Sequence, residues 1–284
     1  MKKFICNFNY TKKLIFLIFM LLFGISVCAC DKNCDKNIEE NNINNIIESV
    51  EVDCIFSIGN DCRPAHYLRE HELRTQSAPL DWMMKYSLDT VITLFETKFE
   101  SFFKNISEIP KKNSSKHRTV LDTVNNITSI HHFEKENSLE EEQSNFTNTM
   151  KIRATKTIST IEESSSIGLI CDRNDETNES LIDFIKKFSV IFPDKQITLI
   201  NIFDSDIEKN LNKKIILDDK NLKIIQYEFY DHVPDKSWKG NNYFWDKIVN
   251  NIKLKPKTIT DQSSEKLVSN SETVSSQNIT MSID

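Results

Sequence analysis

The chain has 284 residues, 39% hydrophobic and 27% charged, which is typical of a globular protein long enough to bury a sizeable core. Its net charge is −6 at pH 7, and removing an N-terminal leader that carries four lysines would take it to −10. This acidity argues against a nucleic-acid partner, which would require a basic face.

Residues 1–30 combine a lysine-rich start with an apolar run over residues 14–27, the pattern of an export signal. The run is shorter than the roughly 20 residues that span a membrane comfortably. The sequence Val-Cys-Ala-Cys, which ends at Cys30, resembles a bacterial lipobox and implies cleavage and lipidation at Cys30. An uncleaved signal anchor and a secreted form are the alternatives. We therefore expect an exported protein, held at a membrane by a lipid or by the signal itself.

Three further segments follow from composition. Residues 31–49 are polar, acidic and rich in asparagine, which predicts a tether. Residues 255–284 are rich in serine, threonine and asparagine and have no periodicity, which predicts a disordered tail. Residues 50–254 are predicted to form the folded domain.

The domain opens with a strand over residues 52–58, where apolar residues alternate. Either Asn60 or Asp61 can cap a helix that begins near Cys62. A thiol at the N-terminus of a helix feels the positive end of the helix dipole, which favours the thiolate of a nucleophilic cysteine. The adjacent carboxylate of Asp61 acts in the opposite direction.

The remaining elements alternate between amphipathic segments of helix length and apolar runs of strand length. Helices are predicted over residues 82–103 (one or two), 138–163, 175–188 and 243–252, with a helical turn over 207–211 and an irregular loop over 105–125. Strands are predicted near residues 128–133, 166–171, 196–202 and 222–227. This order predicts an α/β fold, a single three-layer domain with a mostly parallel sheet and helices on both faces.

Several short motifs resemble those of a bacterial domain of unknown function, the putative papain-like cysteine peptidase family. They are Gly59-Asn60-Asp61-Cys62, Leu73-Arg74, Pro79-Leu80-Asp81-Trp82, His131-His132-Phe133 and Trp238-Lys239-Gly240 with Trp245. One departure is His132, where the family pattern has an acidic residue. The resemblance implies a thiol hydrolase or transferase that acts on a peptide or amide substrate. It also implies a papain-like α+β fold, which we keep as the alternative architecture.

A thiol mechanism requires a base within hydrogen-bond reach of Cys62. His131 is the preferred base because it lies near a strand end after a long loop and matches the His-Phe element of the family. His132 is a less favoured neighbour. His66, four residues after Cys62, would share its helix face and is a further alternative.

The group that orients the histidine is predicted to be Asp81, which occupies the acidic position most similar to the family pattern. Asp172 and Asp231 stay open as alternatives, and Asp81 could instead cap a helix that begins at Trp82. The predicted catalytic residues are thus Cys62, His131 and Asp81.

Other chemistries lack sequence support. The chain contains no GxGxxG, GxxxxGK[ST], GxSxG or HExxH motif, and its domain has no CxxC pair, so we expect no cofactor and no metal. A disulfide between Cys54 and Cys171, or one that includes Cys62, is conceivable in an oxidising compartment. Two other functions stay open: a non-catalytic surface lipoprotein with a binding face, and a Rossmann-like enzyme of another class, such as a carbohydrate-modifying enzyme.

Overall fold

A computed structural model describes residues 45–110, 116–206, 210–232 and 238–256. The chain divides into two units, Met1–Asn45 and Ile46–Asp284, and every element below lies in the second unit. The predicted leader, most of the predicted tether and nearly all of the predicted tail lie outside the described residues. Within the described residues, no helix is both long and apolar enough to cross a membrane.

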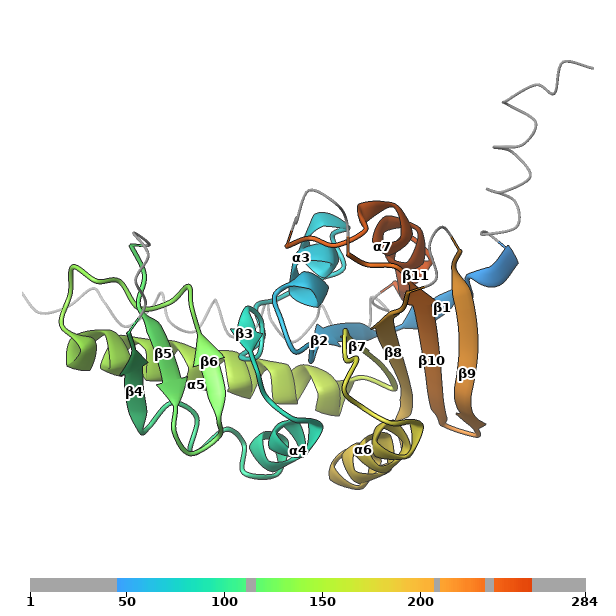
Figure 1. The fold of residues 1–284 in the computed structure, drawn as a ribbon. Helices are drawn as coiled ribbons and strands as arrows, with labels where there is room; N and C mark the ends of the chain where they lie inside the picture. The colour runs from blue at the N-terminus through green and yellow to red at the C-terminus, as the bar shows by residue number, and fades with distance from the viewer. Residues whose placement is uncertain (1–44, 111–115, 207–209, 233–237, 257–284) are drawn as a thin grey trace, which may run out of the picture. The chain divides into compact units, whose positions relative to one another are not determined.

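A five-stranded sheet lies at the centre of the domain (Figure 1). Its spatial order is β2 (Cys54–Ser57), β7 (Ser166–Cys171), β8 (Gln196–Asp204), β10 (Leu222–Phe229) and β9 (Asn212–Asp219). The first four strands are parallel, and β9 pairs antiparallel to β10 at the edge. Every residue of β7 is buried, as expected for a parallel strand that is covered on both faces.

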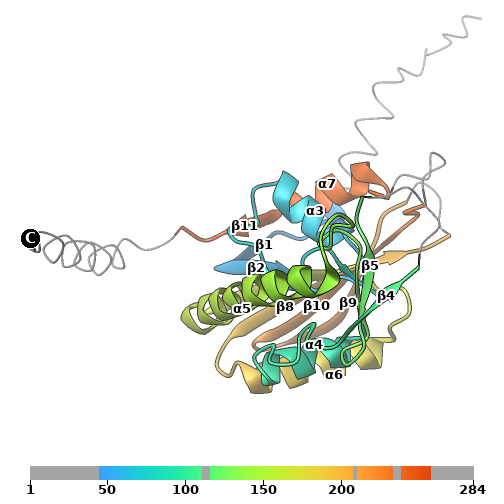
Figure 2. The same ribbon diagram turned by 90° about the vertical axis from the view of Figure 1, so that its left-hand side faces the viewer.

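Helices cover both faces of this sheet (Figure 2). α3 (Arg63–Glu70) and α7 (Asn242–Val249) lie on one face, and α4 (Leu88–Glu96), α5 (Leu139–Glu163) and α6 (Asn178–Ile191) pack on the other. α5 begins where the sequence predicts, because the Ser138 hydroxyl accepts a hydrogen bond of 3.2 Å from the Glu141 N–H. The predicted α/β fold with a mostly parallel sheet is confirmed.

A second, antiparallel sheet is inserted between α3 and α5. Its order is β3 (Met83–Met84), β6 (Ile127–Ser129), β5 (Thr119–Asp122) and β4 (Ile106–Ile109). The strand predicted near residues 128–133 therefore belongs to this sheet and not to the main one. β4 and β5 lie within the segment that was predicted as an irregular loop. β4 was missed because three of its four residues are exposed and show no apolar pattern. The presence of this sheet leaves the papain-like α+β alternative compatible with the structure.

Two further predictions need correction. The helix predicted over residues 82–103 is shorter, since β3 precedes it and only α4 is helical. After β8, strand β9 occupies residues for which no element was predicted, and most of the helical turn predicted over 207–211 lies outside the described residues. β9 was missed because it is an edge strand with no fully buried residue, so its sequence is largely polar.

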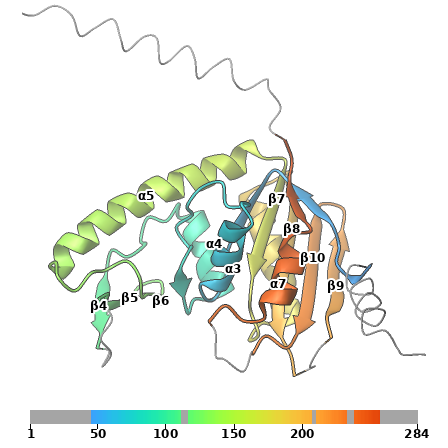
Figure 3. The same cartoon turned by 90° about the horizontal axis from the view of Figure 1, so that it is seen from above.

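α5 connects the two sheets (Figure 3). Its 25 residues extend about 37 Å at 1.5 Å per residue. Near its N-terminus, Phe146 packs against Phe103 and Phe133 at ring-centroid distances of 4.8 Å each. Near its C-terminus, Ile161 belongs to the same continuous core as Phe56 of β2. The helix therefore holds the second sheet beside the carboxyl end of β2.

The ends of the domain are also paired. β1 (Val50–Val52) and β11 (Ile252–Leu254) form a two-stranded parallel sheet. One strand was predicted over residues 52–58, but Asp53 separates β1 from β2. At this break the Asp53 carboxylate accepts hydrogen bonds from the backbone N–H groups of Ser165 and Ser166 at 2.8 and 2.7 Å.

Candidate thiol site

Cys62 lies directly at the start of α3, after the carboxyl end of β2. It occupies the N-cap position, and the Asp61 carboxylate accepts a hydrogen bond of 2.7 Å from the Arg63 N–H. Pro64 follows in the first turn, where its missing N–H costs little. Asp61 therefore takes the capping role, while the thiol of Cys62 makes no capping bond and is free to face a pocket.

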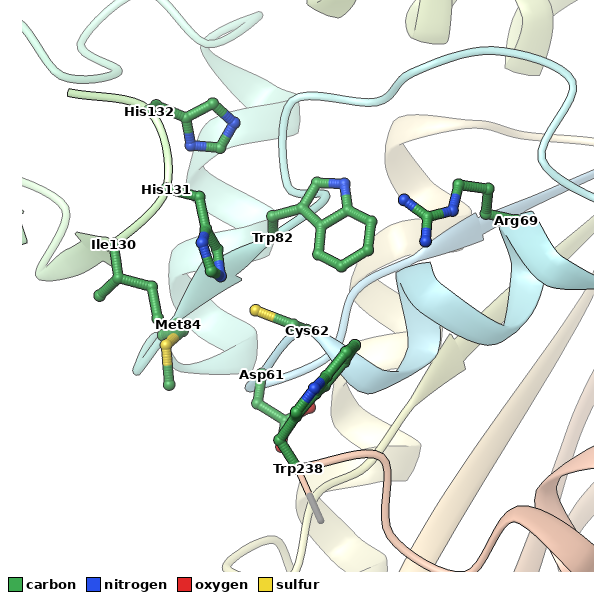
Figure 4. Close-up of a pocket in the computed structure, with 9 residues that line it drawn as sticks. All are labelled: Asp61, Cys62, Arg69, Trp82, Met84, Ile130, His131, His132 and Trp238. Atoms are coloured by element: carbon green, nitrogen blue, oxygen red, sulfur yellow. The ribbon is translucent and has the colours of Figure 1, made fainter. Parts of the chain in front are cut away.

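A pocket of about 540 Å³ opens at Cys62 (Figure 4). Its lining consists of Asp61, Cys62, Arg69, Trp82, Met84, Ile130, His131, His132 and Trp238. One side comes from α3 and the segment before α7, and the other comes from β3 and the loop after β6. The pocket therefore lies where the main sheet and the second sheet meet.

The structure brings Cys62 and His131 into this pocket, and Figure 4 shows the thiol directed toward the His131 ring. The ring of His131 stands edge-on to Trp82, with centroids 6.3 Å apart. His66, the alternative base, is buried and packs edge-on against Trp238 at 4.9 Å, and the pocket lining does not include it. His131 is therefore better placed than His66 to act on the thiol.

His132 also lines the pocket, but its environment is different. Its Nδ1 atom lies 2.9 Å from the Ser129 hydroxyl. Burial, followed by the positive charge of Arg153, lowers the pKa of His132 to about 4. The ring is consequently neutral near pH 7, and its hydrogen bond holds it to the end of β6.

The electrostatics of the thiol differ from the expectation. Burial, followed by the charges of Asp61 and Asp172, raises the pKa of the Cys62 thiol to about 12. We expected the dipole of α3 to lower this pKa. With only 7% of the residue exposed, loss of hydration is the largest cause, and the helix is only eight residues long. The side chain of Cys62 is therefore a neutral thiol near pH 7.

Asp81 lies in the loop that leads to β3. Its buried carboxylate accepts hydrogen bonds from Arg74 Nε at 2.7 Å and from the Ala78 N–H at 2.8 Å. The next residue, Trp82, has a φ of 66°, a left-handed conformation that is costly for a bulky residue. These bonds support a role in holding the loop that presents Trp82. The alternative that Asp81 caps a helix beginning at Trp82 is wrong, and its predicted role in orienting His131 stays a prediction.

The other two acidic candidates surround Arg63. The guanidinium pairs with Asp61 at 3.0 Å, with Asp172 at 3.9 Å, and with Asp231. These residues line a separate cavity of about 190 Å³ at the carboxyl ends of β7 and β10. Burial and the charge of Asp61 raise the pKa of Asp172 well above its usual value. Asp61 lines both cavities, so this network and the thiol pocket meet at the start of α3.

Cys54, Cys62 and Cys171 are all free and buried. Cys54 accepts a hydrogen bond from Ser164, and the Cys171 thiol donates one to Asn201, each at 3.3 Å. The disulfides considered from the sequence are therefore not formed among these residues. The described residues also contain no group of three or more side chains that could hold a metal ion.

Arg69, Met84 and Ile130 also line the pocket, although the sequence did not predict them there. Arg69 could have been found, since it follows Cys62 by seven residues, about two helical turns, and lies on the same face. Met84 and Ile130 carried no such signal, because their approach depends on the pairing of β3 with β6.

The fold and the site together define a three-layer α/β domain with a cysteine and a histidine in one pocket, the pair that thiol-dependent enzymes use. A comparison with protein-family models matches residues 53–216 to DUF1796, described as "putative papain-like cysteine peptidase". The match covers more than half of the chain, and the chain belongs to this family. It includes Cys62, Asp81 and His131 but ends before Trp238. Searches of curated proteins and of solved structures gave no significant match.

Proposed function

We propose that this protein is a thiol hydrolase or transferase that cleaves a peptide or amide bond, with Cys62 as nucleophile and His131 as base. The observation that carries the proposal is the shared pocket, in which the thiol is directed toward the His131 ring. Membership of the cysteine peptidase-like family supports the same chemistry.

The raised thiol pKa determines how the reaction would start. A preformed thiolate is disfavoured by burial and by Asp61, so the proton must leave as the sulfur attacks. The sulfur forms a bond to the substrate carbonyl carbon while neutral His131 takes the thiol proton. His131 then gives this proton to the leaving amine as the C–N bond breaks. Water, or an acceptor amine in a transferase, then attacks the thioester carbonyl carbon while His131 takes its proton. The C–S bond breaks, the product leaves, and His131 returns the proton to the sulfur, which restores the thiol.

The test is hydrolysis of fluorescently labelled casein, with iodoacetamide alkylation of Cys62 followed in parallel by mass spectrometry. We expect Cys62→Ala to abolish hydrolysis. His131→Ala should lower both hydrolysis and alkylation by about 100-fold, the lower end of what a general base contributes. His71→Gln is the matched control, because this histidine pairs with Asp246 outside the pocket and its loss should change neither rate. Hydrolysis that survives in Cys62→Ala contradicts the proposal.

A non-catalytic binding domain is the second candidate function, and the thiol pKa of about 12 favours it. It predicts that His131→Ala leaves the alkylation rate of Cys62 unchanged across pH. The two candidates therefore separate in the same alkylation experiment.

We also propose that the protein is exported and held at a membrane through a lipid on Cys30 or through an uncleaved signal anchor. The lysine-rich start, the short apolar run and the Val-Cys-Ala-Cys sequence support this proposal. A surface location would present the thiol pocket to peptides outside the cell.

A further inference from the structure

Among the residues that the structure describes, Arg69 is the one permanently positive side chain in the lining of the thiol pocket, and four of the other lining residues are apolar: Trp82, Met84, Ile130 and Trp238. Arg69 lies two turns after Cys62 on the same face of α3, and both residues line the pocket. Figure 4 shows Trp82 between the Arg69 guanidinium and the histidines, with Cys62 flanked by Trp82 and Trp238. The pocket therefore extends from the Cys62 sulfur, past the two tryptophan rings, to the Arg69 guanidinium.

Trp82 and Glu70 hold the Arg69 guanidinium in place, but neither contact prevents it from binding a ligand. Its central carbon lies 5.0 Å from the centre of the Trp82 ring, a cation–π contact. Its carboxylate partner is the adjacent Glu70, at 3.0 Å, and about half of each side chain is exposed. An ion pair this exposed is weak in water, so a substrate carboxylate can displace Glu70. A guanidinium also presents a planar fork of donors that matches a carboxylate.

The aromatic walls provide a second recognition element. Trp238 is 52% exposed, although it is a large apolar side chain, and its ring is supported edge-on by buried His66. Trp82, Met84 and Ile130 supply further apolar surface. Such walls favour a flat or large apolar group of the substrate.

Asp61 is the acidic residue among the described residues of the pocket lining. Its carboxylate is paired with Arg63 at 3.0 Å, so it repels a bound anion only weakly. Away from Asp61, the charged side chain that a ligand meets among the described lining residues is therefore Arg69.

We propose that the pocket selects substrates in which an aromatic or large apolar side chain lies next to a carboxylate. The apolar group packs against Trp82 and Trp238, and the carboxylate pairs with Arg69. The seven residues from Cys62 to Arg69 correspond to about 10 Å of helix rise, or roughly three residues of extended peptide. Cleavage of such a substrate rests on the proposed function, whereas its binding does not.

The test uses the Cys62→Ser variant, which removes the thiol, and three capped tripeptides measured by isothermal titration calorimetry at low salt. Acetyl-Glu-Phe-Glu-amide places a carboxylate on both sides of the aromatic ring, so the result does not depend on chain direction. Acetyl-Gln-Phe-Gln-amide is its neutral isostere, and acetyl-Glu-Ser-Glu-amide lacks the ring. We expect the first peptide to bind about 10-fold more tightly than either of the others.

Two variants locate this preference. Arg69→Gln, introduced into the Cys62→Ser variant, should remove the preference for the Glu peptide over the Gln peptide. Arg69→Lys should retain part of this preference, since the charge remains without the planar fork. Lys104→Gln is the control, because this exposed lysine lines a different pocket and should leave the preference unchanged. Equal affinity for the Glu and Gln peptides, a preference that survives Arg69→Gln, or no binding at millimolar concentration overturns the inference. Casein hydrolysis that survives in Cys62→Ala, together with an intact preference for the Glu peptide, would refute only the proposed function.

Discussion

Asp61 has two effects that act against each other at Cys62. Its carboxylate accepts the hydrogen bond that begins α3 and pairs with Arg63, so it helps to place the thiol. Its charge also raises the thiol pKa, second only to burial. Asp61 therefore helps to position the Cys62 side chain while its charge disfavours ionisation of the thiol.

Replacing Asp61 by Asn should therefore lower the Cys62 pKa. The negative charge raises the pKa by disfavouring the thiolate, so its removal shifts the alkylation profile to lower pH. At a fixed pH below the pKa, we expect alkylation of the Cys62 peptide by iodoacetamide to become several-fold faster. The rate is measured by mass spectrometry between pH 7 and about 9, around the ordinary thiol pKa.

The control for this change is Asp89→Asn, an exposed carboxylate that pairs with Lys187 and should leave the rate unchanged. An Asp61→Asn profile that coincides with that of the parent would show that the charge of Asp61 does not contribute to the Cys62 pKa.

At the scale of elements, α5 and the second sheet determine whether a pocket exists. His131 and Ile130 follow β6, whereas Cys62 follows β2, and the two strands belong to different sheets. α5 packs on both sheets in one continuous core. The relative position of thiol and imidazole thus depends on the packing of a helix that contributes no residue to the pocket lining.

Phe146→Ala should destabilise the domain by about 3 kcal/mol or more, the usual cost of removing a buried aromatic side chain. Phe146 is 6% exposed and contacts the rings of Phe102, Phe103 and Phe133. Urea unfolding followed by tryptophan fluorescence measures the free energy of unfolding. Ile152→Ala on the same helix is the matched control, since Ile152 is 59% exposed and its loss should cost little. Equal losses for the two variants would contradict the packing role of α5.

At the scale of the whole molecule, the predicted leader, tether and tail flank one α/β domain. The lipobox-like sequence predicts that the mature N-terminus is a lipidated Cys30. Mass spectrometry of the N-terminus, with fractionation of the Cys30→Ala variant, measures this directly. We expect the parent in the membrane fraction with its leader removed, and loss of the lipid in the variant.

An intact Met1 in the membrane fraction would instead establish the signal anchor. Cleavage at another position would end the lipoprotein proposal.

Sequence alone determined the elements whose signals are local. β7, β8 and β10 are runs of apolar residues, and α5 begins at the predicted hydroxyl cap. Periodicity alone predicted α6, and its predicted bounds of 175–188 lie three residues before the observed ones. The placement of Cys62 at a helix start after a strand was equally local.

Only the tertiary structure decided the rest. β4 and β9 are mostly exposed, and their pairing depends on backbone hydrogen bonds that leave no pattern in the side chains. The pocket joins Arg69 and Trp238, which are far apart in sequence. The sign of the Cys62 pKa shift followed from burial and not from the dipole of α3, because loss of hydration depends on every segment packed around the sulfur.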